Sequence, residues 1–298
     1  MSTMPNFLII GAAKGGTTSL YHYLSQHPQI YMSTVKEPRF FALEGEELNF
    51  NNPDQGINRD SITQLREYQD LFKDVKDEIA IGEASPLYLY SAKAADRIRH
   101  YIPDVKLIAI LRDPSERAYS CYTHLVRENY ESLSFEEGLC EEFKRIQDNW
   151  AHLWHYRQGG YYYSQLKPYF EKFSRDNIRI YRFEDLNNDS MSVVWDIYQF
   201  LGVDDAFIPD LTRMNVSGKP KIKALQTLLG TGNTTRSLIK RILPTEFRKD
   251  IARRLRSWNL KQKGEMPADI REKLIHDYRE DILQLQELIN TDLSAWLE

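Results

Sequence analysis

Four short apolar runs, each closed by a polar or glycine-rich stretch, predict buried strands. They are Phe7–Gly11, Ile79–Gly82, Lys106–Leu111 and Ile178–Tyr181. Segments with helical spacing of apolar residues lie between and after them: Thr17–Ser25, Ser61–Phe72, Ala92–His100, Pro114–Glu128, Ser134–Asp148, Ser164–Phe173, Ser190–Leu201, Lys221–Leu229, Glu246–Arg256 and Ala268–Thr291. This alternation predicts an α/β protein with a P-loop-like three-layer fold. Its central, mostly parallel sheet is flanked by helices, and its C-terminal part is rich in helix.

The chain of 298 residues can form one large domain or two small ones. It contains no internal repeat, low-complexity tract or proline-rich linker. We therefore expect a single domain over residues 1–298.

Composition excludes several functional classes. A hydrophobic content of 42% and a charged content of 28% are ordinary for a soluble enzyme. The net charge of −4 and the lack of a Lys/Arg run argue against a nucleic-acid partner. Cys121 and Cys140 are too few for a disulfide framework and lack the spacing of metal ligands. No apolar run reaches the length of a signal peptide or of a membrane span, so we expect a cytoplasmic protein without a membrane partner. The oligomeric state stays open.

The strongest local motif follows the first predicted strand. A glycine-rich turn there opens a helix whose first residues carry hydroxyl groups, in the order Lys14, Gly15, Gly16, Thr17, Thr18 and Ser19. Glycines let the backbone approach an anion, and the unpaired N–H groups and dipole of a helix start favour negative charge. The motif predicts a phosphate-binding loop, in preference to a strand–helix turn without a ligand.

The order of residues in this loop differs from that of nucleotide triphosphatases. Their pattern places the lysine directly before the hydroxyl that holds magnesium, whereas Lys14 here precedes two glycines. The loop can still bind an anion. A magnesium-dependent P-loop kinase or triphosphatase is the alternative enzyme.

Two further stretches carry candidate chemistry. Arg112 follows a predicted strand, and the stretch continues through Asp113 as N-cap and Pro114 to Ser120. Open α/β sheets bind ligands at this strand end, although a capped structural helix accounts for the pattern equally well. Glu37 precedes a proline and has apolar neighbours, so partial desolvation could raise its pKa toward that of a general base. The residues alone favour the other interpretation, a surface glutamate paired with Lys36 or Arg39.

In this order and spacing the three stretches resemble the sulfotransferase superfamily that uses 3′-phosphoadenosine-5′-phosphosulfate (PAPS). The resemblance is closest to the branch with heparan sulfate sulfotransferases and bacterial enzymes. It is specific over the first 130 residues and looser through Arg182-Phe183-Glu184-Asp185-Leu186 to Gly202. It implies transfer of a sulfuryl group from PAPS to a hydroxyl or amine of a small molecule or glycan, with 3′,5′-diphosphoadenosine (PAP) as product and no metal.

The resemblance also implies a role for each matching residue. Lys14, Gly15, Gly16, Thr17, Thr18 and Ser19 would hold the 5′-phosphosulfate, with Lys14 at the bridging oxygen and stabilising the leaving group. Arg112 and Ser120 would bind the 3′-phosphate, and Glu37 would be the catalytic base. Lys219 matches, loosely, a late loop that closes over the nucleotide. His124, one helical turn beyond Ser120, is a further candidate because other branches use a histidine base, although a packed or solvated role is favoured.

The acceptor is the least determined part of this prediction. Some glycan-modifying relatives carry a lysine where this chain has Ala84, in Gly82-Glu83-Ala84-Ser85-Pro86, and the departure argues against a glycan. The loop after Glu37 is acidic, and an acidic cleft rim would suit a neutral or cationic small molecule. A catalytically silent nucleotide-binding protein that has lost the base is the alternative from another functional class.

Overall fold

The computed structural model describes residues 3–212, 219–220, 260–261 and 265–298. Five strands form one sheet: β1 (Phe7–Gly11), β2 (Ile30–Met32), β3 (Ala80–Ala84), β4 (Lys106–Leu111) and β5 (Ile178–Arg182). Their order is β2-β3-β1-β4-β5, and every neighbouring pair is parallel. The predicted parallel sheet is therefore confirmed. The sequence missed β2, whose three residues are too few to show a strand pattern.

The α-helices of the described residues are α1 (Thr17–Leu24), α2 (Phe40–Leu43), α3 (Gly56–Asp60), α4 (Leu65–Asp70), α5 (Leu87–Tyr90), α6 (Ala94–Tyr101), α7 (Pro114–Arg127), α8 (Phe135–Cys140), α9 (Glu142–Gln147), α10 (Tyr162–Lys172), α11 (Phe183–Asn188), α12 (Ser190–Leu201) and α16 (Ala268–Ile289). The helix predicted over 134–148 is divided at Glu141 into α8 and α9. The predicted helices 221–229 and 246–256 lie outside the described residues, and the single-domain extent 1–298 stays a prediction.

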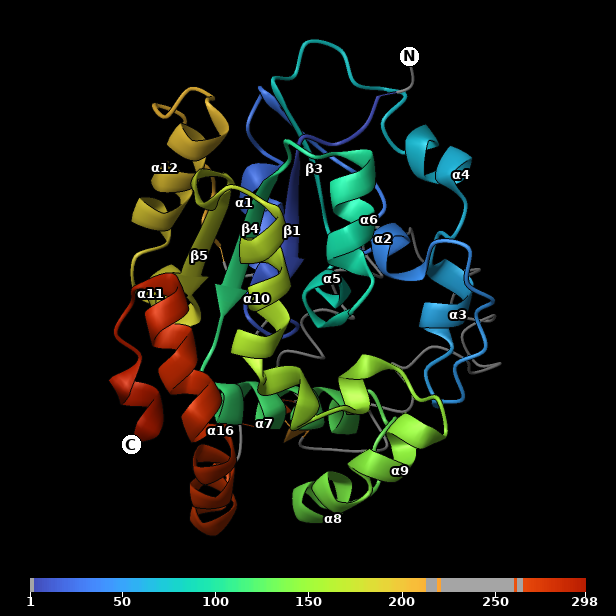
Figure 1. Ribbon diagram of the computed structural model, residues 1–298, viewed down its shortest axis with the longest axis vertical. Coiled ribbons are helices and arrows are strands. Elements are labelled where there is room, and N and C mark those ends of the chain that lie inside the picture. The colour runs from blue at the N-terminus through green and yellow to red at the C-terminus, as the bar shows by residue number, and fades with distance from the viewer. Residues whose placement is uncertain (1–2, 213–218, 221–259, 262–264) are drawn as a thin grey trace, which may run out of the picture.

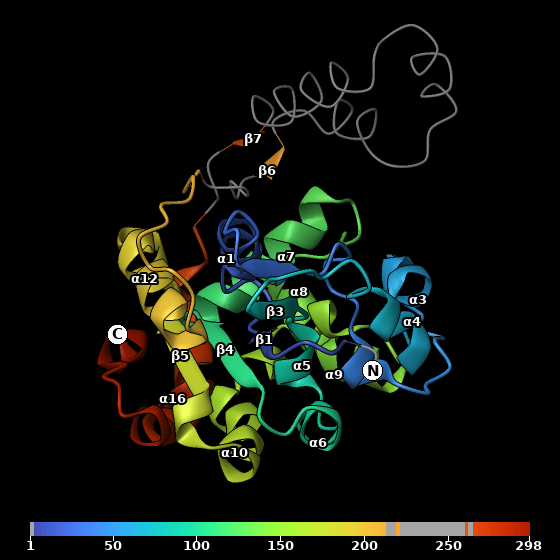
Figure 2. The ribbon, with the colours of Figure 1, turned by 90° about the horizontal axis from the view of Figure 1, so that it is seen from above.

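Alternating residues of the strands face two different helical layers, as the pleat requires. Leu8 and Ile10 of β1 belong to a core shared with α2, α5, α6, α10 and α16. Phe7 and Ile9 belong to a second core shared with α1 and α12. Figures 1 and 2 show the sheet between these two groups of helices, which confirms the three-layer arrangement.

The carboxyl ends of all five strands lie at one edge of the sheet because the strands are parallel. Helix α7 runs beyond this edge, with α8 and α9 on the same side (Figure 1). Asp113 caps α7 by accepting hydrogen bonds from the N–H groups of Ser115 and Glu116, and Pro114 occupies its first turn. The predicted cap is thus confirmed, and it fixes the start of α7 directly after β4.

A buried carboxyl group lies at the carboxyl end of β3. Glu83 is fully buried and accepts hydrogen bonds from the hydroxyl groups of Tyr68, Tyr88 and Ser85. Burial raises the pKa of Glu83 to about 7, although these hydrogen bonds act in the opposite direction. The ordinary value is 4.5, so at pH values between the two the folded chain binds a proton that the unfolded chain has lost.

We expect Glu83→Gln to reduce the pH dependence of stability. A raised folded-state pKa makes the free energy of unfolding fall as pH rises from the unfolded pKa to the folded pKa, by roughly 3 kcal/mol for this residue. Glutamine keeps acceptors for the tyrosine hydroxyls and does not titrate. Urea unfolding at about pH 5 and about pH 8 measures this fall. Between the two pH values, the free energy of unfolding of the variant should fall by up to about 3 kcal/mol less than that of the parent. The exposed Glu47→Gln is the control, and equal losses in Glu83→Gln and the parent would contradict the prediction.

Candidate functional site

The loop between β1 and α1 has a backbone that few sequences can adopt. Lys14 and Gly16 have φ angles of 68° and 103°, both in the left-handed region. A Cβ atom on Gly15 would lie 2.2 Å from the carbonyl oxygen of Ile110 in β4, so only glycine fits there. The two predicted glycines therefore have distinct roles: Gly15 lets the loop pack against β4, and Gly16 turns the chain into the helix.

The start of α1 is open to an anion. Thr17, Thr18 and Ser19 form its first turn, and no side chain of the described residues caps it. The N–H groups of Thr17 and Thr18 have no partner inside the helix, whereas that of Ser19 donates to the carbonyl of Gly16, and the helix dipole places partial positive charge at this end. This arrangement has the features of an anion site built from backbone groups.

Positive side chains gather around the loop. Burial lowers the pKa of Lys14, and the nearby guanidinium groups of Arg127 and Arg112 lower it further, while Cys121 and Glu37 act in the opposite direction. These cations repel one another, and a bound anion would offset that repulsion and stabilise their charged forms. The loop thus combines an open helix start with three cationic side chains from β1–α1, the end of β4 and α7.

Arg112 is held at the end of β4. Its guanidinium group lies 4.6 Å from the centre of the Phe183 ring and 3.2 Å from a carboxylate oxygen of Glu116. With its side chain 14% exposed, Arg112 is partly accessible. Ser120 is buried two turns into α7, the helix that also supplies Arg127. The structure therefore places Arg112 and Lys14 near each other and Ser120 on a neighbouring element.

Lys219 belongs to a two-residue strand, β6 (Lys219–Pro220), which pairs antiparallel with β7 (Leu260–Lys261). The backbone of β6 contacts α7. The backbone position of Lys219 alone does not place its side chain at the nucleotide, so that role stays a prediction.

Glu37 lies in the segment between β2 and α2, which is tied to the carboxyl end of β3. Its N–H group donates to the carbonyl of Ala84, and the N–H group of Arg39 donates to the hydroxyl of Ser85. Glu37 and Arg39 both have left-handed φ angles, of 62° and 59°. Strained backbone of this kind gathers at functional sites, and Lys14 shares it.

The ion-paired glutamate that the residues alone favoured at position 37 is confirmed, and the alternative of a raised pKa was wrong. Burial alone would raise it, but ion pairs with Lys36 and Arg39, at 2.7 and 2.9 Å, bring the pKa down to about 2. Glu37 thus pairs with both of the residues that the sequence offered as partners. Its side chain is only 29% exposed, so it is less accessible than a surface glutamate. It is therefore an ionised carboxylate at the edge of the site.

His124 faces the same region. An N–H group of Arg127 donates to its Nδ1 atom at 2.8 Å, so the neutral imidazole carries its proton on Nε2. Burial, with the charges of Lys14 and Arg127, lowers the pKa of His124 to about 3. Arg127 was not among the residues predicted from the sequence, although Ser120, His124 and Arg127 follow helical spacing and so share one face of α7.

The fold and these contacts define a three-layer α/β protein with a candidate anion site after its first strand. Its sequence matches the model of the Sulfotransferase family over residues 5–207. The chain therefore belongs to the sulfotransferase family, as its motifs predicted.

Three similar proteins agree with this family. The chain is 31% identical over 211 residues to the bifunctional heparan sulfate N-deacetylase/N-sulfotransferase 4 of Mus musculus, which covers 67% of this chain and 22% of that protein. It is 29% identical over 238 residues to the heparan sulfate glucosamine 3-O-sulfotransferase 3B1 of Mus musculus, and this alignment covers 73% of this chain and 54% of that protein. The chain thus spans about a fifth and about half of these two relatives. A solved sulfotransferase from Alicyclobacillus acidocaldarius superposes with a TM-score of 0.80 and 35% identity over 99% of this chain and 100% of that one.

No helix of the described residues combines the length and the apolar character that a membrane span needs.

Proposed function

We propose that this chain transfers a sulfuryl group from PAPS to a hydroxyl or amine of a small-molecule or carbohydrate acceptor. The observation that carries the proposal is the open helix start next to Lys14, together with the cations of Arg112 and Arg127 and the carboxylate of Glu37, all of which lie near enough to shift the pKa of Lys14. A donor with phosphate groups at both ends matches this distribution of positive charge.

The residues fit the two ends of PAPS as follows. Backbone N–H groups and hydroxyls of residues 15–19, with Lys14, would bind the 5′-phosphosulfate. Arg112 and Ser120 would bind the 3′-phosphate, and the Phe183 ring, whose centre lies 4.6 Å from the Arg112 guanidinium, would help to keep that group in place. Lys219 is proposed for the loop over the nucleotide.

Glu37 and Lys14 would act at opposite ends of the transfer. Glu37 takes the proton of the acceptor hydroxyl while that oxygen forms its bond to sulfur. Lys14 donates to the bridging oxygen, which keeps the electron pair of the broken S–O bond and leaves with PAP. A carboxylate with a pKa of about 2 is a weak base. Negative charge of the bound donor near Lys36 and Arg39 would weaken their hold on Glu37 and raise its pKa.

The proposed 3′-phosphate contact predicts selective loss of PAP binding in Arg112→Ala. Removal of a charge-assisted hydrogen bond should raise the dissociation constant for PAP by roughly 10- to 100-fold. Adenosine 5′-monophosphate, which lacks the 3′-phosphate, should bind the variant and the parent alike. Calorimetric titration of both nucleotides into both proteins, without metal, measures the difference.

Arg182→Ala is the matched control for this titration. Arg182 ends β5, the neighbouring strand, and pairs with Asp185 at 2.7 Å, so its loss should leave PAP binding unchanged. Equal PAP affinity in Arg112→Ala and the parent would contradict the assigned contact. Binding that requires magnesium and prefers ATP would overturn the proposed function and favour a kinase.

The cellular compartment is a separate proposal. A cytoplasmic location follows from the composition described above and from no structural contact, so fractionation of cells that produce the full-length protein is its test.

A further inference from the structure

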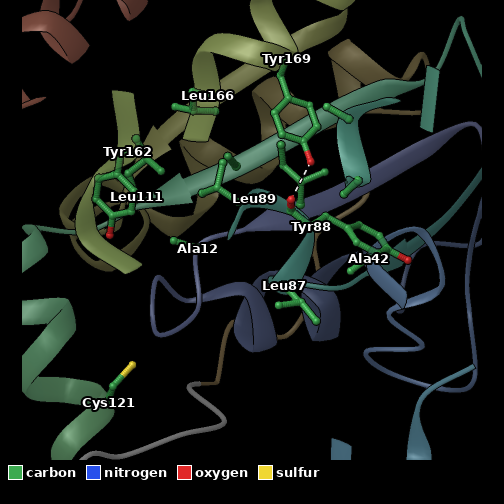
Figure 3. Close-up of a cluster of buried hydrophobic side chains, with 14 of the residues drawn as sticks. Ala12, Ala42, Leu87, Tyr88, Leu89, Leu111, Cys121, Tyr162, Leu166 and Tyr169 are labelled. Carbon is green, nitrogen blue, oxygen red and sulfur yellow. Dashed lines mark hydrogen bonds between the residues drawn. The ribbon is translucent and has the colours of Figure 1, made fainter. Parts of the chain in front are cut away.

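A cavity of about 600 Å³ lies among α2, α3, α5, α9 and α10. Its wall is largely apolar, with side chains that include Leu43, Ile57, Leu87, Leu89, Trp150 and Tyr169. Figure 3 shows Ala42, Leu87, Leu89 and Tyr169, four of the lining residues, together with Ala12 of the phosphate loop. A volume of this size accommodates a small organic molecule.

The cavity adjoins both halves of the proposed reaction. Leu89 lines it and also packs on the start of the phosphate loop, since a Cβ atom on Gly11 would lie 2.7 Å from the Leu89 Cβ. His152 lines it too, and the charges of Arg39 and Glu37 influence the pKa of His152. The wall of the cavity thus includes one residue that packs next to the donor loop and one that lies near the proposed base.

The wall offers no formal charge. Among the lining residues that the structure describes, none is Asp, Glu, Lys or Arg. The acidic loop after α2 does not change this, because Glu44 and Glu46 pair with Arg97, and Glu46 also pairs with Lys93. Two acids of the rim expected from the sequence, Glu44 and Glu46, are therefore paired with cations at the start of α6 and within it.

The polar groups of the wall are neutral donors and acceptors. His155 is 7% exposed, and its Nδ1 atom lies 2.7 Å from the hydroxyl of Tyr90, while its Nε2 atom has no partner among the described residues. The Nδ1 atom of His152 is likewise without one. Burial brings the pKa values of His152 and His155 down to about 3 and about 4. Buried polar atoms are normally hydrogen-bonded, so these two atoms suit a ligand.

We propose that this cavity binds the acceptor, and that the acceptor is an uncharged molecule with an apolar body that reacts through a hydroxyl group. The assignment rests on the proposed function. An anionic glycan would need cations that this wall lacks, and burying its charges without partners is unfavourable. Ala84, where some glycan-modifying relatives carry a lysine, is fully buried and adds no cation.

Two acceptors of the same shape test the charge preference. 2-Naphthol is uncharged, and 6-hydroxy-2-naphthoate adds one carboxylate to the same ring system. We expect 2-naphthol to be sulfated with a kcat/KM at least roughly 10-fold higher, and heparan sulfate to be a poorer acceptor than 2-naphthol. Calorimetric titration of 2-naphthol into the full chain, with and without saturating PAP, measures binding apart from turnover.

A pair of variants on α9 locates the bound molecule. Ile146 lines the cavity at its rim and is 37% exposed, whereas Phe143, 71% exposed, is not part of the wall. Ile146→Glu should raise the dissociation constant for 2-naphthol by roughly 10-fold or more, because it adds a charge to the wall. Phe143→Glu should not change it, and both variants should bind PAP like the parent.

The outcomes separate the two proposals. Loss of PAP binding in the parent would overturn the proposed function, and 2-naphthol binding that Ile146→Glu weakens would still support the cavity. PAP binding with no 2-naphthol binding, or with 6-hydroxy-2-naphthoate or heparan sulfate as the better acceptor, would overturn the cavity proposal alone.

Discussion

Lys14→Ala should lower kcat/KM for sulfuryl transfer by roughly 10²- to 10³-fold, equivalent to about 3–4 kcal/mol at the transition state. Lys14 lies in the anion loop and is half-buried, so a charge that forms beside it is less screened than it would be in open water. The bridging oxygen gains negative charge as the S–O bond breaks, and Lys14 would stabilise that charge more than the ground state. We therefore expect kcat to fall more than the affinity for PAP. Transfer of labelled sulfate from PAPS, with calorimetry of PAP, measures both quantities.

Lys273→Ala is the control for this variant. Lys273 lies on α16, is 66% exposed, and makes ion pairs with Glu136 and Asp269 at 3.7 and 3.9 Å. Exposed pairs of this kind contribute little, so its loss should leave turnover and thermal unfolding unchanged. Turnover of Lys14→Ala near that of the parent would remove Lys14 from the proposed chemistry, whereas a fall that accompanies loss of folding would show in the thermal unfolding.

The parts of the site predicted best are those that depend on neighbouring residues in the sequence. The loop of Lys14, Gly15 and Gly16 follows from one strand, one turn and one helix start, and each of these leaves its own local signal. The cap at Asp113 is equally local, and it placed Arg112 at the end of β4. The family followed from the order of these motifs. By contrast, the break at Glu141 separates two short helices within one run of helical pattern, which periodicity does not resolve.

The electrostatics were predicted less well because they depend on residues that only the fold brings together. The apolar neighbours of Glu37 indicated desolvation, but the turn that directs both Lys36 and Arg39 onto its carboxylate uses left-handed backbone that the sequence does not reveal. The cavity is a stronger case. Its wall joins residues near positions 43, 89, 150 and 169, and no local pattern connects them.

Glu37→Gln should lower kcat by roughly 10²- to 10⁴-fold while leaving the affinity for PAP nearly unchanged. The amide keeps the size of the side chain and one acceptor oxygen, but it does not take up the proton of the acceptor. Because the pKa of Glu37 lies near 2, well below its ordinary 4.5, the carboxylate is ionised in the free protein from about pH 4 upward. We therefore expect no acidic limb from Glu37 in the kcat/KM profile of the parent between about pH 5 and pH 8.

Two further variants separate the loss of a base from the loss of an ion pair. Glu46→Gln removes a glutamate that pairs with Lys93 and Arg97 at 2.6 and 2.9 Å, away from the proposed chemistry, and should keep the activity of the parent. Glu37→Asp retains a carboxylate on a shorter side chain and should recover part of the turnover that the amide loses. Equal activity of Glu37→Gln and the parent would transfer the role of base to another group. Equal loss in Glu37→Gln and Glu37→Asp, with weakened PAP binding in both, would instead give Glu37 a role in holding Lys36 and Arg39 in place. Only a defect in kcat that aspartate partly restores fits a proton acceptor at this position.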